Sequence, residues 1–148
     1  MNLVHRLILF PLISALPLIF ILSNCARESS PVGGPKDTLA PQIVREKPIN
    51  SSINITPQKI EIFCDENVTL NNIADNCLIS PLLETKPKFS ARKSKITIDL
   101  SKQKLQPNTT YSFNFSNAIQ DINEGNKLEQ YSYAFSTGTS FDSLKIAG

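Results

Sequence analysis

The stretch that decides the fold is residues 105–116, which read LQPNTTYSFNFS. Its second half alternates aromatic residues, Tyr111, Phe113 and Phe115, with small polar residues. Because successive side chains of a β-strand point to opposite faces, this alternation predicts a strand with one buried face. The preceding Gln-Pro-Asn is typical of a turn, since proline fixes φ and asparagine tolerates turn conformations. The stretch therefore predicts a turn that leads into a half-buried antiparallel strand.

The same two-residue alternation occurs elsewhere in the chain. Isoleucine or leucine alternates with polar residues at 60–62 and 96–100, and aromatic residues do so at 131–135. Shorter strands, separated by turn residues, are expected at 43–47, 68–70, 78–80 and 83–85. No segment carries a sustained helical repeat. About seven short strands over roughly 100 residues predict an all-β fold, an antiparallel β-sandwich at residues 42–138.

Composition restricts the class of protein. The chain has 148 residues, a formal net charge of +2, 41% hydrophobic residues and 19% charged residues. This length accommodates one ordinary domain, and the balance is that of a globular rather than a disordered chain. A net charge this small does not provide the basic face that nucleic-acid binding needs, so we expect no nucleic-acid partner.

Residues 1–24 have the pattern of a secretory signal peptide. A single early cation, Arg6, precedes an apolar run at 7–22. A membrane-spanning helix needs about 20 apolar residues. This run is shorter, and Pro11 and Pro17 would disrupt a helix interior. An uncleaved membrane anchor is the alternative, and the lengths favour the signal peptide.

The end of this segment resembles the lipobox of bacterial lipoproteins. Leu22-Ser23-Asn24-Cys25 has an aliphatic residue, two small residues and then a cysteine. The resemblance implies cleavage between Asn24 and Cys25, with a diacylglyceryl group and an acyl chain added to Cys25. Two or more acyl chains make a stable membrane anchor. Ala26, where an aspartate would signal inner-membrane retention, implies the outer membrane of a Gram-negative bacterium, with either face left open.

Residues 25–41 are predicted to link this anchor to the domain. They are rich in proline, glycine and serine, which is typical of a flexible tether. Cleavage before Cys25 would also remove His5 and Met1, the sole histidine and methionine, and the chain has no tryptophan. The mature chain therefore lacks the histidine that Ser-His-Asp triads, Cys-His pairs and histidine-bearing zinc sites require.

Several motifs of the mature chain resemble one family of Ig-like domains. They include Pro31–Thr38, Ile79-Ser80-Pro81, Pro107–Tyr111, the Asp-x-x-x-Gly-Asn turn at 121–126, and Phe135-Ser136-Thr137-Gly138. Together they look like the N-terminal Ig-like domain of the S-layer-protein (SbsA) type in Gram-negative lipoproteins. The resemblance implies an Ig-like sandwich with a mostly structural role and no catalytic residues. It also implies that residues 139–148 begin a following β domain, because such proteins are usually longer.

A local resemblance concerns the opening stretch itself. Leu105, Pro107 and Tyr111 match the Leu-x-Pro-x-Thr-x-Tyr pattern of fibronectin-type and bacterial Ig-like domains, which is the tyrosine corner. In that motif the tyrosine ring packs inward and its hydroxyl bonds to upstream backbone. We therefore expect a buried, hydrogen-bonded Tyr111, a turn fixed by Pro107, and a core closed at one end by Leu105.

The two remaining cysteines, Cys64 and Cys77, leave two alternatives open. In an oxidising envelope they could form a disulfide that closes a short loop. A domain of this size can also manage without a disulfide, and both could then be buried thiols. Two cysteines cannot form a structural zinc site unaided.

Asp121, Asn123 and Asn126 offer oxygen ligands for calcium. Their spacing with a nearby glycine is similar to a calcium-binding loop. However, the glycine is at the fifth position instead of the sixth and no glutamate closes the loop, which favours an Asx-rich turn between strands. Asp65-Glu66 and Asp121 with Glu124 raise the question of a glycosidase carboxylate pair, but nothing in the sequence indicates a cleft. We expect no cofactor other than the lipid on Cys25.

Two short motifs suggest covalent modification. Asp37-Thr38-Leu39 and Asp142-Ser143-Leu144 resemble the three-residue O-glycosylation motif of some Gram-negative phyla. Thr38 and Ser143 are therefore candidate O-glycosylation sites. Asn-x-Ser/Thr triplets also occur, but that rule belongs to eukaryotic secretion.

These features predict a non-catalytic, lipid-anchored outer-membrane Ig-like module that serves as a spacer or interaction domain of the cell envelope. Its partners would be the membrane, through the lipid, and a protein or glycan at the envelope. One alternative is a glycan- or protein-binding module of a surface nutrient-uptake system. Another is the stalk of a longer protein whose enzymatic part lies beyond this chain.

Overall fold

The computed structural model describes residues 34–141. The chain divides into two units, Met1–Pro35 and Lys36–Gly148, and the fold below is that of the second. The predicted signal peptide, the cleavage position at Asn24 and Cys25, and the second glycosylation candidate Ser143 lie outside the described residues. Within those residues, no helix is long and apolar enough to cross a membrane.

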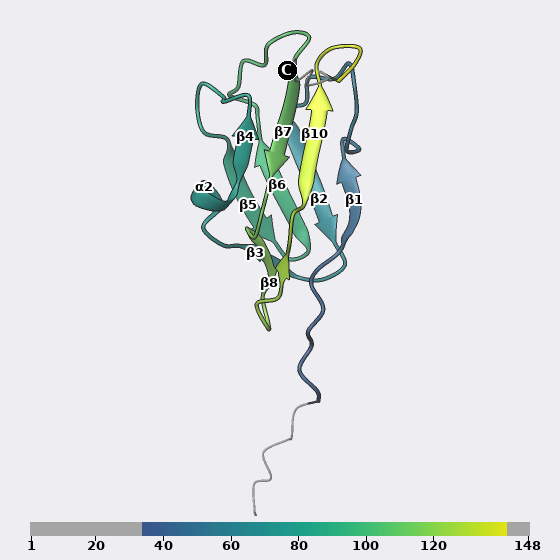
Figure 1. Ribbon diagram of the computed structural model, residues 1–148, viewed down its shortest axis with the longest axis vertical. Helices are drawn as coiled ribbons and strands as arrows, with labels where there is room; N and C mark the ends of the chain where they lie inside the picture. Colours follow the sequence, from purple (N-terminus) through teal and green to yellow (C-terminus); the bar gives the residue numbers. More distant parts are fainter. Residues whose placement is uncertain (1–33, 142–148) are drawn as a thin grey trace, which may run out of the picture. The chain divides into compact units, whose positions relative to one another are not determined.

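Ten strands and one short helix make up the described fold, which is all-β and antiparallel (Figure 1). The four-stranded sheet has the order β1 (Ile43–Lys47), β2 (Lys59–Cys64), β6 (Lys95–Asp99), β5 (Lys88–Arg92). The facing sheet has the order β10 (Ser132–Ser136), β7 (Thr110–Asn114), β4 (Leu78–Ser80). A third sheet has the order β3 (Val68–Leu70), β8 (Ile119–Asp121), β9 (Lys127–Leu128), and α2 (Ile73–Asn76) lies beside β4. The predicted β-sandwich is confirmed.

The core forms where the four-stranded sheet faces the sheet of β10, β7 and β4. On one inner face, Ile60 pairs with Ile98, and Ile62 pairs with Ile96, across β2 and β6. The other inner face is aromatic and comes from β7, β10 and the residue after β7. All of these core side chains are 0–2% exposed: Ile60, Ile62, Ile96, Ile98, Tyr111, Phe113, Phe115, Tyr133 and Phe135. The two-residue alternation in the sequence therefore marks the core directly.

The aromatic side chains pack in specific pairs within this core. Tyr111 and Phe135 are directly opposite each other on β7 and β10, and their rings stack with centroids 5.4 Å apart. Phe115 stacks on Tyr131 at 5.6 Å and meets the edge of Phe89 from β5 at 6.3 Å. The contact between Phe115 and Phe89 joins one sheet to the other, and each aromatic pair adds about 0.5–1.5 kcal/mol to the stabilisation from burial.

One side of the sandwich is closed by the loop after β1. The Asn50 side chain makes the hydrogen bonds that a neighbouring strand would make with β10. Its Nδ2 donates to Ser132 O and its Oδ1 accepts from Ala134 N, both at 2.9 Å. Next to it, Ser136 N donates to Ser52 O at 2.9 Å. These bonds satisfy backbone groups along the edge of β10 that would otherwise remain open. On the opposite side, the outer edges of β4 and β5 carry no strand among the described residues.

The strand predictions hold with one error and several omissions. Strands at 43–47, 68–70 and 78–80 have the predicted bounds. The strand expected at 83–85 is wrong, because that segment is a loop between Pro81 and Pro87, and proline cannot donate to a ladder. β5, β8, β9 and α2 were not predicted. β8, β9 and α2 are too short to show a pattern, and β5 alternates only Phe89 and Ala91 with polar residues, which is a weak signal.

The opening stretch forms a compact corner at one end of the core. Gln106 N donates to Tyr111 Oη at 2.8 Å, and Tyr111 is 2% exposed. Leu105 is partly buried and packs against the core. Thr137 Oγ1 donates to Gln106 O at 2.7 Å and accepts from Thr109 N at 2.9 Å. The corner is thereby tied to the segment that follows β10.

Gly138 makes this closure sterically feasible. A Cβ atom at this position would lie 2.9 Å from Asn108 Cα, closer than real Cβ atoms approach other atoms. Asn108 belongs to the turn with Pro107, so the closing Phe-Ser-Thr-Gly motif and the tyrosine corner form one structural unit. Two motifs that lie far apart in the sequence are thus parts of the same closure.

Replacing Tyr111 by Phe should lower the free energy of unfolding by about 1 kcal/mol or more, because the buried hydroxyl is removed and the Gln106 N–H loses its acceptor. Urea unfolding followed by circular dichroism measures this loss. The slope of the transition should stay unchanged, since the same surface is exposed on unfolding. An unchanged midpoint would contradict a stabilising role for the corner.

Candidate functional site

The turn between β8 and β9 holds the carboxylate that we considered as a calcium ligand. Asp121 is 1% exposed, and its Oδ1 accepts from Glu124 N at 2.6 Å and from Gly125 N at 3.0 Å. Its Oδ2 accepts from Asn126 N at 2.8 Å. Gly125 has a φ of 78°, the left-handed conformation that suits glycine. Both carboxylate oxygens are therefore used by backbone donors, as the Asx-turn interpretation requires.

The other two residues of the calcium prediction belong to the same turn. Asn126 turns its side-chain amide to the backbone, and Nδ2 donates to Asp37 O at 3.1 Å. Asn123 is exposed in the turn that joins β8 to β9. Within residues 34–141, no three His, Cys, Asp or Glu side chains are grouped so that they could hold a metal ion. The turn thus anchors the chain that enters the domain, and contacts begin at Asp37, within the segment predicted as tether.

Hydrogen bonding controls the protonation of Asp121. Burial acts to raise the pKa of this carboxyl group, but the backbone N–H groups of Glu124, Gly125 and Asn126 outweigh it and lower the pKa below its usual value. The Asp65 carboxylate also binds backbone, because Gln42 N donates to Asp65 Oδ1 at 2.8 Å. These carboxylates hold backbone segments in place, which is not the arrangement of a glycosidase pair across a cleft.

Cys64 and Cys77 are free thiols in the described part of the chain, with no disulfide between them. Cys64 ends β2 in the four-stranded sheet, whereas Cys77 precedes β4 in the facing sheet. Burial, with Asp65 and Glu66 nearby, raises the pKa of Cys64 to about 11. Burial alone raises the pKa of Cys77 to about 11. At neutral pH both are protonated and are therefore poor nucleophiles.

The candidate glycosylation site Thr38 is exposed, and it stands where the chain enters the domain. Asp37 Oδ1 accepts from Leu39 N at 2.9 Å, which forms a local turn around Thr38.

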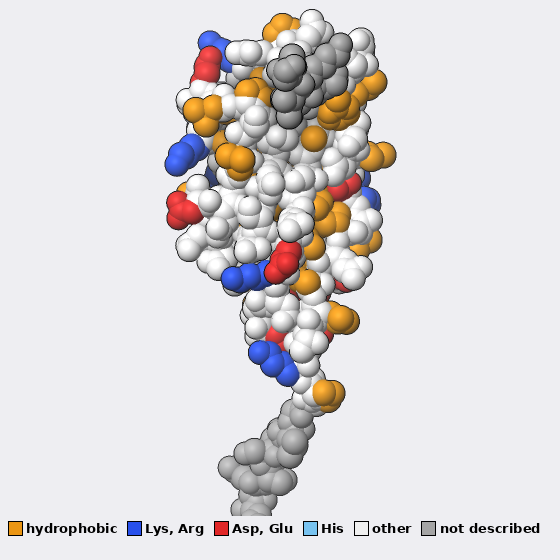
Figure 2. Space-filling model, in the orientation of Figure 1, with side chains coloured by type: hydrophobic (Ala, Val, Ile, Leu, Met, Phe, Trp, Pro, Cys, Tyr) orange, Lys and Arg blue, Asp and Glu red, His pale blue; other side chains and the backbone are white. Residues whose placement is uncertain are grey.

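On the face drawn in Figure 2, charged side chains of both signs are scattered toward the margin without gathering into a patch of one sign.

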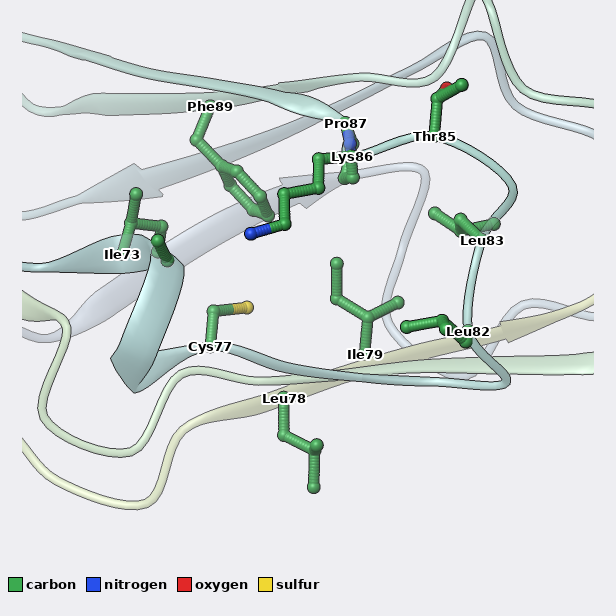
Figure 3. A pocket seen from close by; sticks show the side chains of 11 residues that line it. Ile73, Cys77, Leu78, Ile79, Leu82, Leu83, Thr85, Lys86, Pro87 and Phe89 are labelled. Atoms are coloured by element: carbon green, nitrogen blue, oxygen red, sulfur yellow. The ribbon is translucent and has the colours of Figure 1, made fainter.

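An apolar groove opens at the side of the sandwich where β4 and β5 are the outermost strands of their sheets. Its volume is about 320 Å³. Its walls come from α2, β4, the loop 82–87 and Phe89 of β5 (Figure 3). Ile79 and Cys77 form its floor, while Leu82 at the rim is 91% exposed. Sequence reasoning missed this groove, because it assigned 83–85 to a strand.

A protein-family model described as a bacterial Ig-like domain matches residues 37–137. The chain belongs to this family. The matched region begins where Asp37 is held by Asn126 and ends within the closing motif that packs on the tyrosine corner. An Ig-like domain is a non-catalytic kind of fold. No curated protein sequence matches this chain.

Because the pKa of Asp121 is lowered in the Ig-like domain, its hydrogen bonds stabilise the fold above the pKa of the unfolded chain, about 3.9. That stabilisation is lost as the pH falls from there through the lower folded pKa. Asp121→Asn should therefore lower the Tm at pH 7 and have little effect at about pH 2.

Thermal melts of wild type and Asp121→Asn across this pH range measure the effect. Asp75→Asn, on the exposed surface of α2, is the matched control and should shift the Tm little at every pH. A constant Tm difference between wild type and Asp121→Asn at all pH values would contradict the role of the ionised carboxylate.

Proposed function

We propose that this protein is a lipid-anchored lipoprotein of the Gram-negative outer membrane. In it, an Ig-like domain of the S-layer-protein (SbsA) type serves as a spacer or interaction module of the cell envelope. The observation that carries the proposal is the order of segments along the chain. A lipobox-like Leu22–Cys25 follows an apolar signal-like run, and an Ig-like domain begins only a short distance later.

The chemistry of the described domain supports a structural role. The buried carboxylate of Asp121 is saturated by backbone donors, and Asp65 also binds backbone. The Cys64 and Cys77 thiols are protonated at neutral pH because burial raises their pKa. The sole histidine, His5, lies in the segment that signal cleavage would remove. The polar groups thus act in folding, which suits a module that holds its position and presents a surface.

The proposal places the lipid on Cys25 alone. In cells fed an alkyne analogue of palmitate, the wild-type protein should be labelled and recovered with membranes, whereas Cys25→Ala should be unlabelled. Cys64→Ala and Cys77→Ala are matched controls and should be labelled as strongly as wild type. An unlabelled wild type, or equal labelling of Cys25→Ala, would overturn the proposal.

A further inference from the structure

The groove beside β4 exists because the local sequence prevents the sandwich from closing there. β4 has only three residues and ends at Pro81, which cannot extend the ladder. The loop that follows returns to β5 through Pro87 instead of adding a strand. On the opposite side the equivalent edge is covered by Asn50 and the residues after it. Among the described residues, the groove therefore opens on the side where β4 and β5 are the outermost strands of their sheets.

The lining is mostly apolar, and Thr85 and the cationic Lys86 are its polar side chains. Ile73, Ile79, Leu83 and Phe89 surround the space, and in Figure 3 the Lys86 amine points into it from above. The ion pairs among the described residues join Lys59 and Lys95 to Glu61, and none involves Lys86. An ammonium group at the edge of an apolar groove is complementary to a ligand that has an apolar body and an anionic end.

The size of the groove limits the length of that apolar body. An apolar cavity of about 150 Å³ takes up benzene, which has six carbons. A volume of about 320 Å³ is roughly twice as large, so it suits a chain on the order of ten carbons. An added peptide strand is less suited, because the three residues of β4 offer few backbone hydrogen bonds before Pro81.

We propose that this groove binds one medium-chain free fatty acid. The methylene chain lies along Ile79, Leu83 and Phe89, and the carboxylate meets Lys86 Nζ. Binding depends on chain length, because each added methylene removes apolar surface from water. It also depends on the charge at the ligand end, because Lys86 is the cation at the rim. Binding would give this module a ligand beyond the spacer or interaction role.

Isothermal titration of residues 36–148 with hexanoate, octanoate, decanoate and dodecanoate, below their micellar concentrations, tests the proposal. This segment is one unit that contains the whole core. Each added methylene should tighten the Kd about fourfold until the groove is full. Lys86→Gln should weaken decanoate binding about fivefold. Lys88→Gln, a neighbouring lysine that does not line the groove, is the matched control and should leave the Kd unchanged.

Cys77 reports where the ligand sits, because it lines the groove while Cys64 is buried in the core. At mildly alkaline pH, where a small fraction of the Cys77 thiol ionises despite its raised pKa of about 11, decanoate should slow alkylation of Cys77. A decylammonium ion should bind more weakly than decanoate. Absence of binding, a Kd independent of chain length, or equal effects of Lys86→Gln and Lys88→Gln would overturn the proposal. So would protection of Cys77 by dimerisation or by an added extended peptide in the absence of fatty acid.

Discussion

The structure depends on the contact between an aliphatic face and an aromatic face. The isoleucines of β2 and β6 form one layer, and the aromatic side chains of β7 and β10 form the other. Burial of each large apolar side chain contributes about 1.5–3 kcal/mol, and neither sheet can bury its own face alone. The two sheets therefore stabilise each other, and the remaining features act at the ends and edges of this core. The tyrosine corner closes one end, and the Asp121 turn fixes the hairpin at which the chain enters.

The edge of the sandwich at β10 is covered, whereas the edge at β4 and β5 is open, and the ligand proposal rests on this difference. The edge of β10 is covered by the Asn50 side chain and by residues 51–55, whose hydrogen bonds replace those of a strand. The edge at β4 and β5 is left as an apolar groove with Lys86 at its rim. The polar groups described above mostly hold the domain's own backbone, and the groove is the surface to which we assign a ligand. The spacer role and the ligand proposal are therefore compatible, because they use different parts of the domain.

Local alternation made most of the core predictable from sequence. Ile60, Ile96, Phe113 and Tyr133 all lie on apolar faces that repeat every two residues, and all are buried. The tyrosine corner was also predictable, since Pro107 and Tyr111 are close in the chain and their geometry is local. β5 was missed because Lys88–Arg92 contributes only Phe89 and Ala91 to the core, too weak a pattern to stand out.

Features that depend on segments far apart in sequence could not be predicted in this way. Leu83 looks like part of a strand, and only the positions of α2 and β5 show that it lines a groove. The close approach of Gly138 to Asn108 likewise becomes visible only when both segments are in place. For Asp121 the sequence favours a turn cap over a metal ligand, but carboxylate spacing alone does not show which backbone donors approach the oxygens. Tertiary structure decides these cases.

We expect the two inner faces to unfold together, as one cooperative core. Native-state hydrogen exchange measured by NMR across a denaturant series tests it most directly. The slowest-exchanging amides of β2 and β6 and those of β7 and β10 should share one opening free energy, equal to that of global unfolding. If the β7 and β10 amides exchanged at a much lower free energy while β2 and β6 stayed protected, the two sheets would be separate units and the account would be contradicted.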